Sequence, residues 1–183
     1  MQDTANTDSA QSEMANQAYL QQLKATFEQL PNDIDLYLFT AKGHEDVFTN
    51  ANRQVIRAFR ELSPRITLKE YDLSHELAQK YNITSSPTLL IAPERFSIRW
   101  LGAPMGEEAR TFLEILILVG LGKSNLSDQS LNVTNRIDSS RNIKIFVSPT
   151  CPYCPQQAVN AAKAAVEMPD LVSLEIIDIQ SEP

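Results

Sequence analysis

The two cysteines of this chain lie three positions apart, in the sequence Cys151-Pro152-Tyr153-Cys154, and the chain contains no others. They follow an apolar run, residues 143–147, whose composition is typical of a β-strand. A pair of cysteines at this spacing after a strand is typical of a reversible dithiol. Thiol–disulfide exchange is therefore the leading hypothesis for the chemistry of this protein.

The turn between the expected strand and a following helix gives the two sulfurs different roles. We expect Cys151 to end the loop and Pro152 to occupy the first helical position, where its missing N–H and fixed φ are tolerated. Unpaired amides and the helix dipole then favour a Cys151 thiolate, the attacking nucleophile. Cys154, one turn later, is placed to resolve a mixed disulfide. No Lys or Arg flanks the motif, so the helix end must supply most of the lowering of the thiol pKa.

Two other interpretations of the cysteine pair stay open. A structural zinc site needs four nitrogen or sulfur ligands, and beyond the cysteines the chain offers only His44 and His75, both distant in sequence. No metal is therefore expected. The cysteines could also be inert, although the Pro-Tyr between them and the strand–helix context agree better with a redox motif. Tyr153, expected to be partly exposed, would contact partners.

Composition narrows the function classes. The chain has 183 residues, 43% hydrophobic and 21% charged, as in ordinary globular proteins, and a net charge of −7 without a basic cluster. A nucleic-acid or anionic-membrane surface is thus not expected. The most apolar stretch, residues 112–121, is too short to span a bilayer, and residues 1–14 lack the features of a secretory signal. We expect a frayed amino-terminal tail and a cytoplasmic protein.

Residue periodicity predicts four segments, bounded at 1–32, 33–122, 123–142 and 143–183. The first is a polar tail followed by a helix that ends at Pro31. The second has the order β-α-β-α-β-β-α, with a closing helix that begins near Gly106 and is stopped by Gly122. Its expected strands are residues 34–39, 65–73, 88–91 and 96–101, with a short helix capped by Ser74.

The third segment is expected to be a linker helix capped by Ser127, and the fourth restarts the pattern as β-α-β. This last unit resembles a second copy of the first half of the preceding domain, and it ends at Pro183. A β-α-β unit alone would expose an apolar sheet face and an unpaired edge. We therefore expect the unit to be completed either by another chain, giving a dimer, or by a further carboxyl-terminal part.

Two stretches resemble a known family. Residues 146–155, Phe-Val-Ser-Pro-Thr-Cys-Pro-Tyr-Cys-Pro, and residues 101–108, Leu-Gly-Ala-Pro-Met-Gly-Glu-Glu, are similar to those of tandem thioredoxin-fold protein disulfide oxidoreductases, also called glutaredoxin-like. A similar unit forms the amino-terminal part of the alkyl hydroperoxide reductase flavoprotein subunit. The resemblance covers roughly residues 34–179. It implies an α/β, thioredoxin-like fold, with one complete copy followed by the first β-α-β half of a second.

The resemblance implies a protein-disulfide oxidoreductase that works through a redox-active Cys151–Cys154 disulfide and holds no bound cofactor. Its implied partners are protein disulfide substrates or a peroxiredoxin, with a flavin-dependent reductase or glutathione as the reductant. The alternative function is a non-catalytic docking or assembly module of a larger thioredoxin-fold or peroxiredoxin-reductase system. In it, the cysteine-free first domain supplies the docking surface.

The chain departs from the family pattern in two places. Some members carry a second CxxC in the first domain, where residues 44–52 here contain no cysteine, so the first domain cannot perform thiol chemistry. The chain also lacks the later segment in which the family keeps a cis-proline beside the active cysteines. Pro87 matches the cis-proline position of the first domain, and with Pro152 and Tyr153 it completes the expected substrate-docking residues. His44, near the lost site, is more simply a solvated loop residue.

Overall fold

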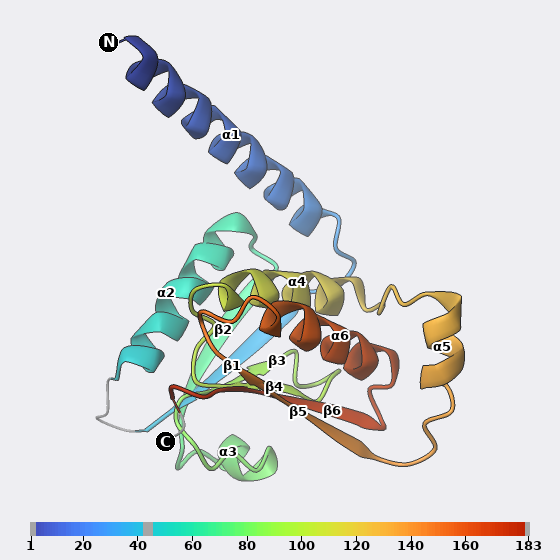
Figure 1. Ribbon diagram of the computed structural model, residues 1–183. Helices are drawn as coiled ribbons and strands as arrows, with labels where there is room; N and C mark the ends of the chain where they lie inside the picture. Colours follow the sequence, from blue (N-terminus) through green and yellow to red (C-terminus); the bar gives the residue numbers. More distant parts are fainter. Residues whose placement is uncertain (1–2, 42–45, 182–183) are drawn as a thin grey trace.

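The computed structural model describes residues 3–41 and 46–181, with side chains from Met14 onward. It contains six strands in one sheet, flanked by helices (Figure 1). In chain order the elements are α1 Asp3–Glu28, β1 Ile34–Thr40, α2 Val47–Leu62, β2 Ile66–Asp72, α3 Glu76–Lys80, β3 Thr88–Ile91, β4 Ile98–Leu101, α4 Glu108–Leu121, α5 Asp128–Thr134, β5 Arg141–Val147, α6 Cys154–Glu167 and β6 Val172–Asp178.

The sheet has the strand order β2-β1-β3-β4-β6-β5 and runs continuously through both halves of the chain. The pairs β1–β2 and β5–β6 are parallel, each joined by a helix, so β-α-β occurs twice. The antiparallel strands β3 and β4 continue the sheet from β1, and β4 pairs in parallel with β6. This mixed α/β arrangement confirms the predicted fold class.

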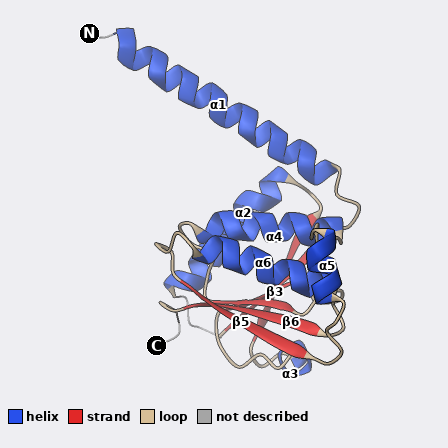
Figure 2. Cartoon of the chain, turned by 45° about the vertical axis from the view of Figure 1, so that its right-hand side comes forward, coloured by secondary structure: helices blue, strands red, loops and turns tan. Residues whose placement is uncertain are grey.

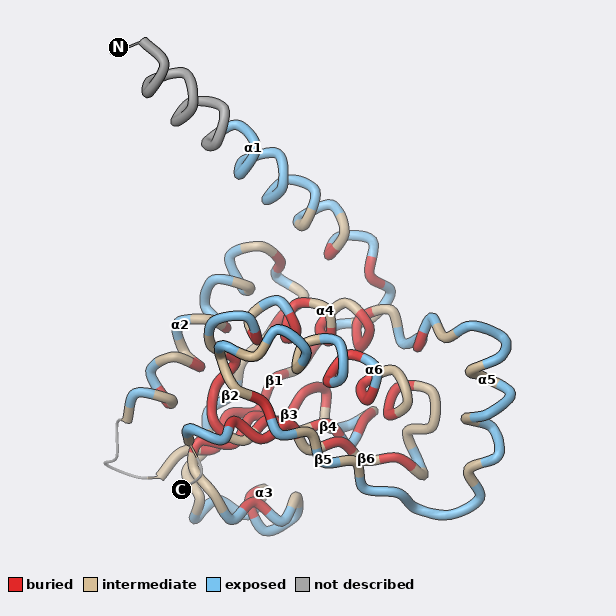
Figure 3. Tube along the Cα trace, in the orientation of Figure 1, coloured by how far each residue is buried: buried red, intermediate tan, exposed pale blue. Residues whose placement is uncertain are grey.

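Helices α2, α4 and α6 lie on one face of the sheet, and the short helix α3 lies on the other (Figures 1 and 2). The main core fills the space between the sheet and the three helices (Figure 3). Trp100 of β4 is fully buried there and meets Phe112 of α4 edge to face, with ring centroids 6.1 Å apart. Phe59 of α2 contacts the same Phe112 at 5.6 Å, which joins the two helices. A smaller aromatic cluster around Tyr37 and Phe39 lies under α3.

Local signals place most element ends correctly. Gly122 ends α4 in the left-handed conformation (φ 65°), and the Ser127 side chain caps α5 by accepting from the Ser130 N–H, both as predicted. The expected strands agree with the observed ones within two residues. The expected cap of α3 at Ser74 is wrong by one position, because the His75 Nδ1 accepts from the Leu77 N–H.

The amino-terminal tail differs from its expectation. A single helix, α1, extends from Asp3 to Glu28 and projects away from the body (Figure 1). The physical reason lies in composition, since residues 3–28 contain five alanines and neither glycine nor proline, so nothing in them stops a helix. The helix is anchored at its carboxyl end, where Phe27 is fully buried and Leu30 follows it into the core.

The open face of the second β-α-β unit also differs from its expectation. The face of β5 and β6 opposite the helices carries an ion pair between Lys144 and Glu175 (3.2 Å). The side-chain amide of Asn142 also donates a hydrogen bond to the Glu175 carboxylate. Phe146 is the large apolar side chain exposed there. An apolar sheet face was therefore the wrong prediction, because the alternation along β5 places polar residues outward. The unpaired edge is observed, since β5 ends the sheet.

No helix in the described part of the chain is both long and apolar enough to cross a membrane.

The contact between α4 and the end of α1 yields a stability prediction. A Cβ added at Gly120 would lie 2.5 Å from the Cδ1 atom of Leu30, which is buried. We expect Gly120→Val to lower the free energy of unfolding by about 1–3 kcal/mol through overpacking, as measured by urea denaturation. In a Leu30→Ala background the same substitution should cost less, because the clashing atoms are gone. Equal costs in both backgrounds would contradict this contact.

Candidate active site

The cysteine motif lies between the end of β5 and the start of α6. The first helical residue is Cys154, so the prediction that Pro152 begins the helix is wrong. Pro155, not Pro152, occupies the first turn, where a missing N–H is tolerated. The sequence offers two prolines near the start of the helix, and Pro152 belongs to the turn that precedes it.

Cys151 and Cys154 are joined as a disulfide, with their Cα atoms 5.5 Å apart. The N–H of Cys154 donates to the Cys151 sulfur at 3.2 Å, so a free amide at the helix start points at that sulfur. This is the contact expected to favour a thiolate when the disulfide is reduced. The Cys154 sulfur lies farther in, against the carbonyl of Phe146 (3.8 Å). Tyr153 between them has 79% of its surface exposed.

The first turn of α4 forms a platform beneath the motif. Gly106, with φ +57°, lies so close to the loop before Cys151 that an added Cβ would be 2.7 Å from the Pro149 carbonyl oxygen. The N–H of Glu107 donates to the same oxygen at 3.3 Å. The segment Leu101–Glu108, which carries part of the family resemblance, thus contacts the cysteine loop directly. This contact explains why two stretches some forty residues apart form one site.

Two buried carboxyl groups lie under this platform, and the sequence did not reveal them. Glu108 is 1% exposed, and neither of its oxygens has a hydrogen-bond partner among the described residues. Burial raises its pKa, the Asp178 and Glu107 carboxylates raise it further, and the Thr111 hydroxyl opposes part of the shift. Burial likewise raises the pKa of Asp178, although the Gln180 N–H opposes it.

The position of Asp178 relates these acids to the cysteines. Asp178 is paired with Val147 at the end of β5, and the following residue, Ile179, donates its N–H to the Val147 carbonyl. Val147 directly follows Phe146, whose carbonyl contacts the Cys154 sulfur. A carboxyl with a raised pKa keeps its proton at pH values where an exposed one has lost it. The signal that could have located Glu108 is its position in the first turn of an apolar helix.

Other buried polar atoms surround the two acids. The indole N–H of Trp100, the Thr111 hydroxyl, the Thr49 hydroxyl and the Asn52 carbonyl oxygen also have no hydrogen-bond partner in the described part of the chain. Asn52 donates its side-chain N–H to the Gly102 carbonyl (2.7 Å), and a Cβ added at Gly102 would lie 2.8 Å from the Cβ of Asp178. Asn52 and Gly102 of the first half thus lie beside Asp178.

Pro87 lies at the same end of the sheet but not beside the cysteines. The Ser86–Pro87 peptide bond is cis. The Ser86 hydroxyl accepts from the Ala41 N–H at 2.8 Å, and the Pro87 carbonyl accepts from the Gly102 N–H. Pro87 precedes β3, and strands β4 and β6 separate β3 from β5, a lateral distance of roughly 14 Å. The structure therefore does not bring Pro87 together with Pro152 and Tyr153. His44 falls outside the described residues.

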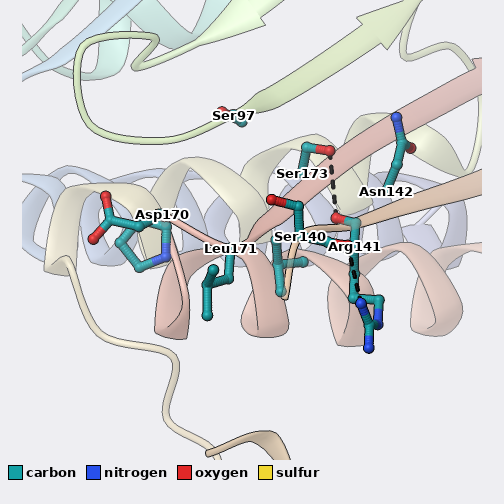
Figure 4. Close-up of a pocket in the computed structure, with 9 residues that line it drawn as sticks. Ser97, Ser140, Arg141, Asn142, Asp170, Leu171 and Ser173 are labelled. Carbon is teal, nitrogen blue, oxygen red and sulfur yellow. Dashed lines mark hydrogen bonds between the residues drawn. The ribbon is translucent and has the colours of Figure 1, made fainter. Parts of the chain in front are cut away.

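One hollow of the surface lies far from the cysteines. It has a volume of about 330 Å³ and lies where β5 and β6 begin, at the opposite end of these strands from the motif (Figure 4). Serine side chains line it, including Ser97, Ser140 and Ser173, together with Arg141. In the described ranges, no group of three or more His, Cys, Asp or Glu side chains could hold a metal ion.

Comparison with known proteins gives relatives in both sequence and structure. No protein-family model matches the chain. The alkyl hydroperoxide reductase AhpF of Staphylococcus aureus strain Mu50 is 26% identical over 150 residues, which span 80% of this chain and 27% of that protein. A mutant of AhpF from Enterococcus faecalis superposes with a TM-score of 0.77 at 26% identity, covering 91% of this chain and 81% of the other. The NTD_N/C domain of the same enzyme superposes with a TM-score of 0.73 at 27% identity, covering 90% of this chain and 80% of the other.

The resemblance to the alkyl hydroperoxide reductase AhpF is confirmed in sequence and in fold. A protein disulfide oxidoreductase from Aeropyrum pernix shares the fold as well, with a TM-score of 0.75 at 20% identity, covering 91% of this chain and 75% of the other. These relatives support a redox role in general. The chain spans about a quarter of the length of the AhpF sequences that it matches.

The buried acids predict an unusual dependence of stability on pH. The folded state binds the Glu108 and Asp178 protons more tightly than the unfolded state does, so stability should fall as pH rises above the ordinary carboxyl range and through the raised pKa values. Glu108→Gln removes its part of this loss and should raise the free energy of unfolding at neutral pH. Urea denaturation between about pH 4 and 8 measures it.

The matched control is Glu114→Gln, which removes a partly exposed carboxylate from the same helix. Its curve of stability against pH should keep the wild-type shape. A Glu108→Gln curve that runs parallel to the wild-type curve would mean that folding does not raise the pKa of Glu108.

Proposed function

We propose that this protein is a thiol–disulfide oxidoreductase in which Cys151 and Cys154 form a dithiol that reduces or exchanges protein disulfides. The observation that carries the proposal is the contact between the Cys154 N–H and the Cys151 sulfur at the start of α6. It gives one sulfur the environment of a stabilised thiolate, while the other lies deeper. The general redox role of the relatives also supports this function.

The proposed reaction has two exchange steps. The Cys151 thiolate attacks one sulfur of the substrate disulfide, the substrate S–S bond breaks, and one substrate thiolate leaves and takes up a proton. The Cys154 thiolate then attacks the Cys151 sulfur, which releases the second substrate thiol and forms the Cys151–Cys154 disulfide. Two electrons have passed to the substrate. In this proposal the Cys151–Cys154 disulfide is the oxidised form of the pair.

A reductant must return two electrons and two protons to the pair. The similarity to AhpF favours a flavin-dependent reductase as that donor and a peroxiredoxin disulfide as the acceptor, with glutathione as the other possible reductant. Because the cysteine loop is exposed through Tyr153, partner proteins can reach the disulfide. In this proposal the first half performs no thiol chemistry. Pro152 and Tyr153 contact the substrate, whereas Pro87 belongs to a site without cysteines.

Serine substitutions test the two cysteine roles. Cys151→Ser should lower turnover of a disulfide substrate by at least about a hundredfold, because the nucleophile is gone. Cys154→Ser should still attack but fail to resolve, so a mixed disulfide with substrate accumulates and is visible by mass spectrometry. Full turnover by the Cys151→Ser variant, or accumulation of a mixed disulfide on Cys154 in the wild-type protein, would refute the assignment.

The second candidate function is that of an assembly module, and the free edge of β5 favours it. β5 ends the sheet, its outer edge has no strand partner in the described chain, and Phe146 beside it is 61% exposed. If this edge joins two copies, sedimentation should show a concentration-dependent dimer that Phe146→Lys weakens by about tenfold. A monomer at all concentrations would count against this function and leave the redox proposal intact.

A further inference from the structure

A groove of about 220 Å³ runs between the first turn of α4 and the cysteine motif. Glu107, just before α4, and Arg110 and Glu114 of α4 line one part of it. Pro152, Pro155 and Gln156 line the other part, from the motif and the start of α6. We call it the α4–α6 groove. Because Pro152 directly follows Cys151, the groove begins one residue from the attacking sulfur. A chain whose disulfide reaches Cys151 can therefore contact its lining.

The groove carries one uncompensated negative charge. Arg110 and Glu114 pair with each other at 3.3 Å, one helical turn apart. The carboxylate of Glu107 forms no ion pair with any described residue, and it makes no capping hydrogen bond although it is the residue before α4. Glu107 is exposed, so its carboxylate stays solvated and available to a partner. The only cation of the lining is already engaged.

The two prolines determine what shape of side chain would fit. Pro152 and Pro155 present rigid apolar surfaces along one side of the groove, opposite the charged side chains of α4. A lysine or arginine matches this combination, since its methylene groups can cover the prolines while its charged end reaches Glu107. An acidic side chain would meet two carboxylates and lose hydration without gaining a partner.

We infer that Glu107 selects disulfide substrates that carry a Lys or Arg within about three residues of the cysteine attacked by Cys151, the basic side chain lying in the α4–α6 groove. Three extended residues span roughly 10 Å, which is within reach of a groove that begins at Pro152. This inference rests on the proposed function, and it makes the first half of the chain a contributor to substrate choice. Glu107 is a specificity-determining residue here, since it does not touch the reacting sulfurs.

Paired peptide substrates test the inference. Two disulfide-bonded peptides of equal length, identical except for Lys or Glu two positions from the cysteine, are compared by kcat/KM on the reduced protein. The wild-type protein should prefer the Lys peptide by about three- to tenfold at low ionic strength, mainly through KM, and the preference should shrink in high salt. Glu107→Gln should abolish the preference, Glu107→Lys should reverse it, and Glu107→Asp should retain it.

The comparison of two peptides on one variant removes general effects of the substitution, such as a change in the pKa of the neighbouring Glu108. Glu61→Lys makes the same charge change on α2, away from the groove, and should keep the wild-type preference. Equal turnover of both peptides by the wild-type protein, or an unchanged preference in Glu107→Lys, overturns the inference alone. If the wild-type protein reduces neither peptide nor a small aromatic disulfide, the proposed function itself fails.

Discussion

The parallel pairing of β4 with β6 is the interaction on which the rest of the structure depends. Four residues of each strand are in register, from Ile98 opposite Leu174 to Leu101 opposite Ile177. This pairing turns two β-α-β patterns into a single sheet and brings α4 beside α6 on the same face. Without it, the loop before Cys151 would have no contact with Gly106 and Glu107, and Asp178 would not lie near Glu108. The site is therefore a product of both halves.

In this arrangement the cysteines and the residues around them come from different halves of the chain. The reactive sulfurs, the helix start and the exposed tyrosine all belong to residues after β5, whereas Glu107 and Glu108 come from the first half. A first half that has no cysteines still contributes to the surroundings of the cysteine motif, because it provides a buried acid and one wall of the groove. The first half contains no cysteine, and its helix α4 packs beside α6.

The residue types near each helix end and strand were enough to predict most elements. The pairing between distant strands could not be predicted from the sequence. Gly122 and Ser127 mark helix ends through the backbone conformation and hydrogen bond that their own residue types favour, so short-range reasoning found them. The pairing of β4 with β6 joins residues more than seventy positions apart, and no periodicity reveals it. The burial of Glu108 follows from that pairing, which is why a charged residue at a helix start was not recognised as part of the site. The polar composition of the first residues also predicts a frayed tail, whereas the structure has a helix there because none of these residues stops one.

The charge of a Cys151 thiolate and the charges of the two buried carboxyl groups affect one another. No lysine or arginine lies within the motif or its immediate flanks, so a Cys151 thiolate depends on the amide of Cys154 and the other free amides at the start of α6. Two ionised carboxylates below the platform would oppose such a thiolate, because like charges in a poorly solvated space repel strongly. Their raised pKa values keep them protonated to higher pH, which removes this opposition over a wider range. A thiolate at Cys151 is therefore opposed less by protonated acids in this part of the molecule than it would be by two carboxylates. The burial that makes Glu108 and Asp178 costly to ionise would, by the same argument, favour a thiolate at the end of β5, where Asp178 pairs with Val147.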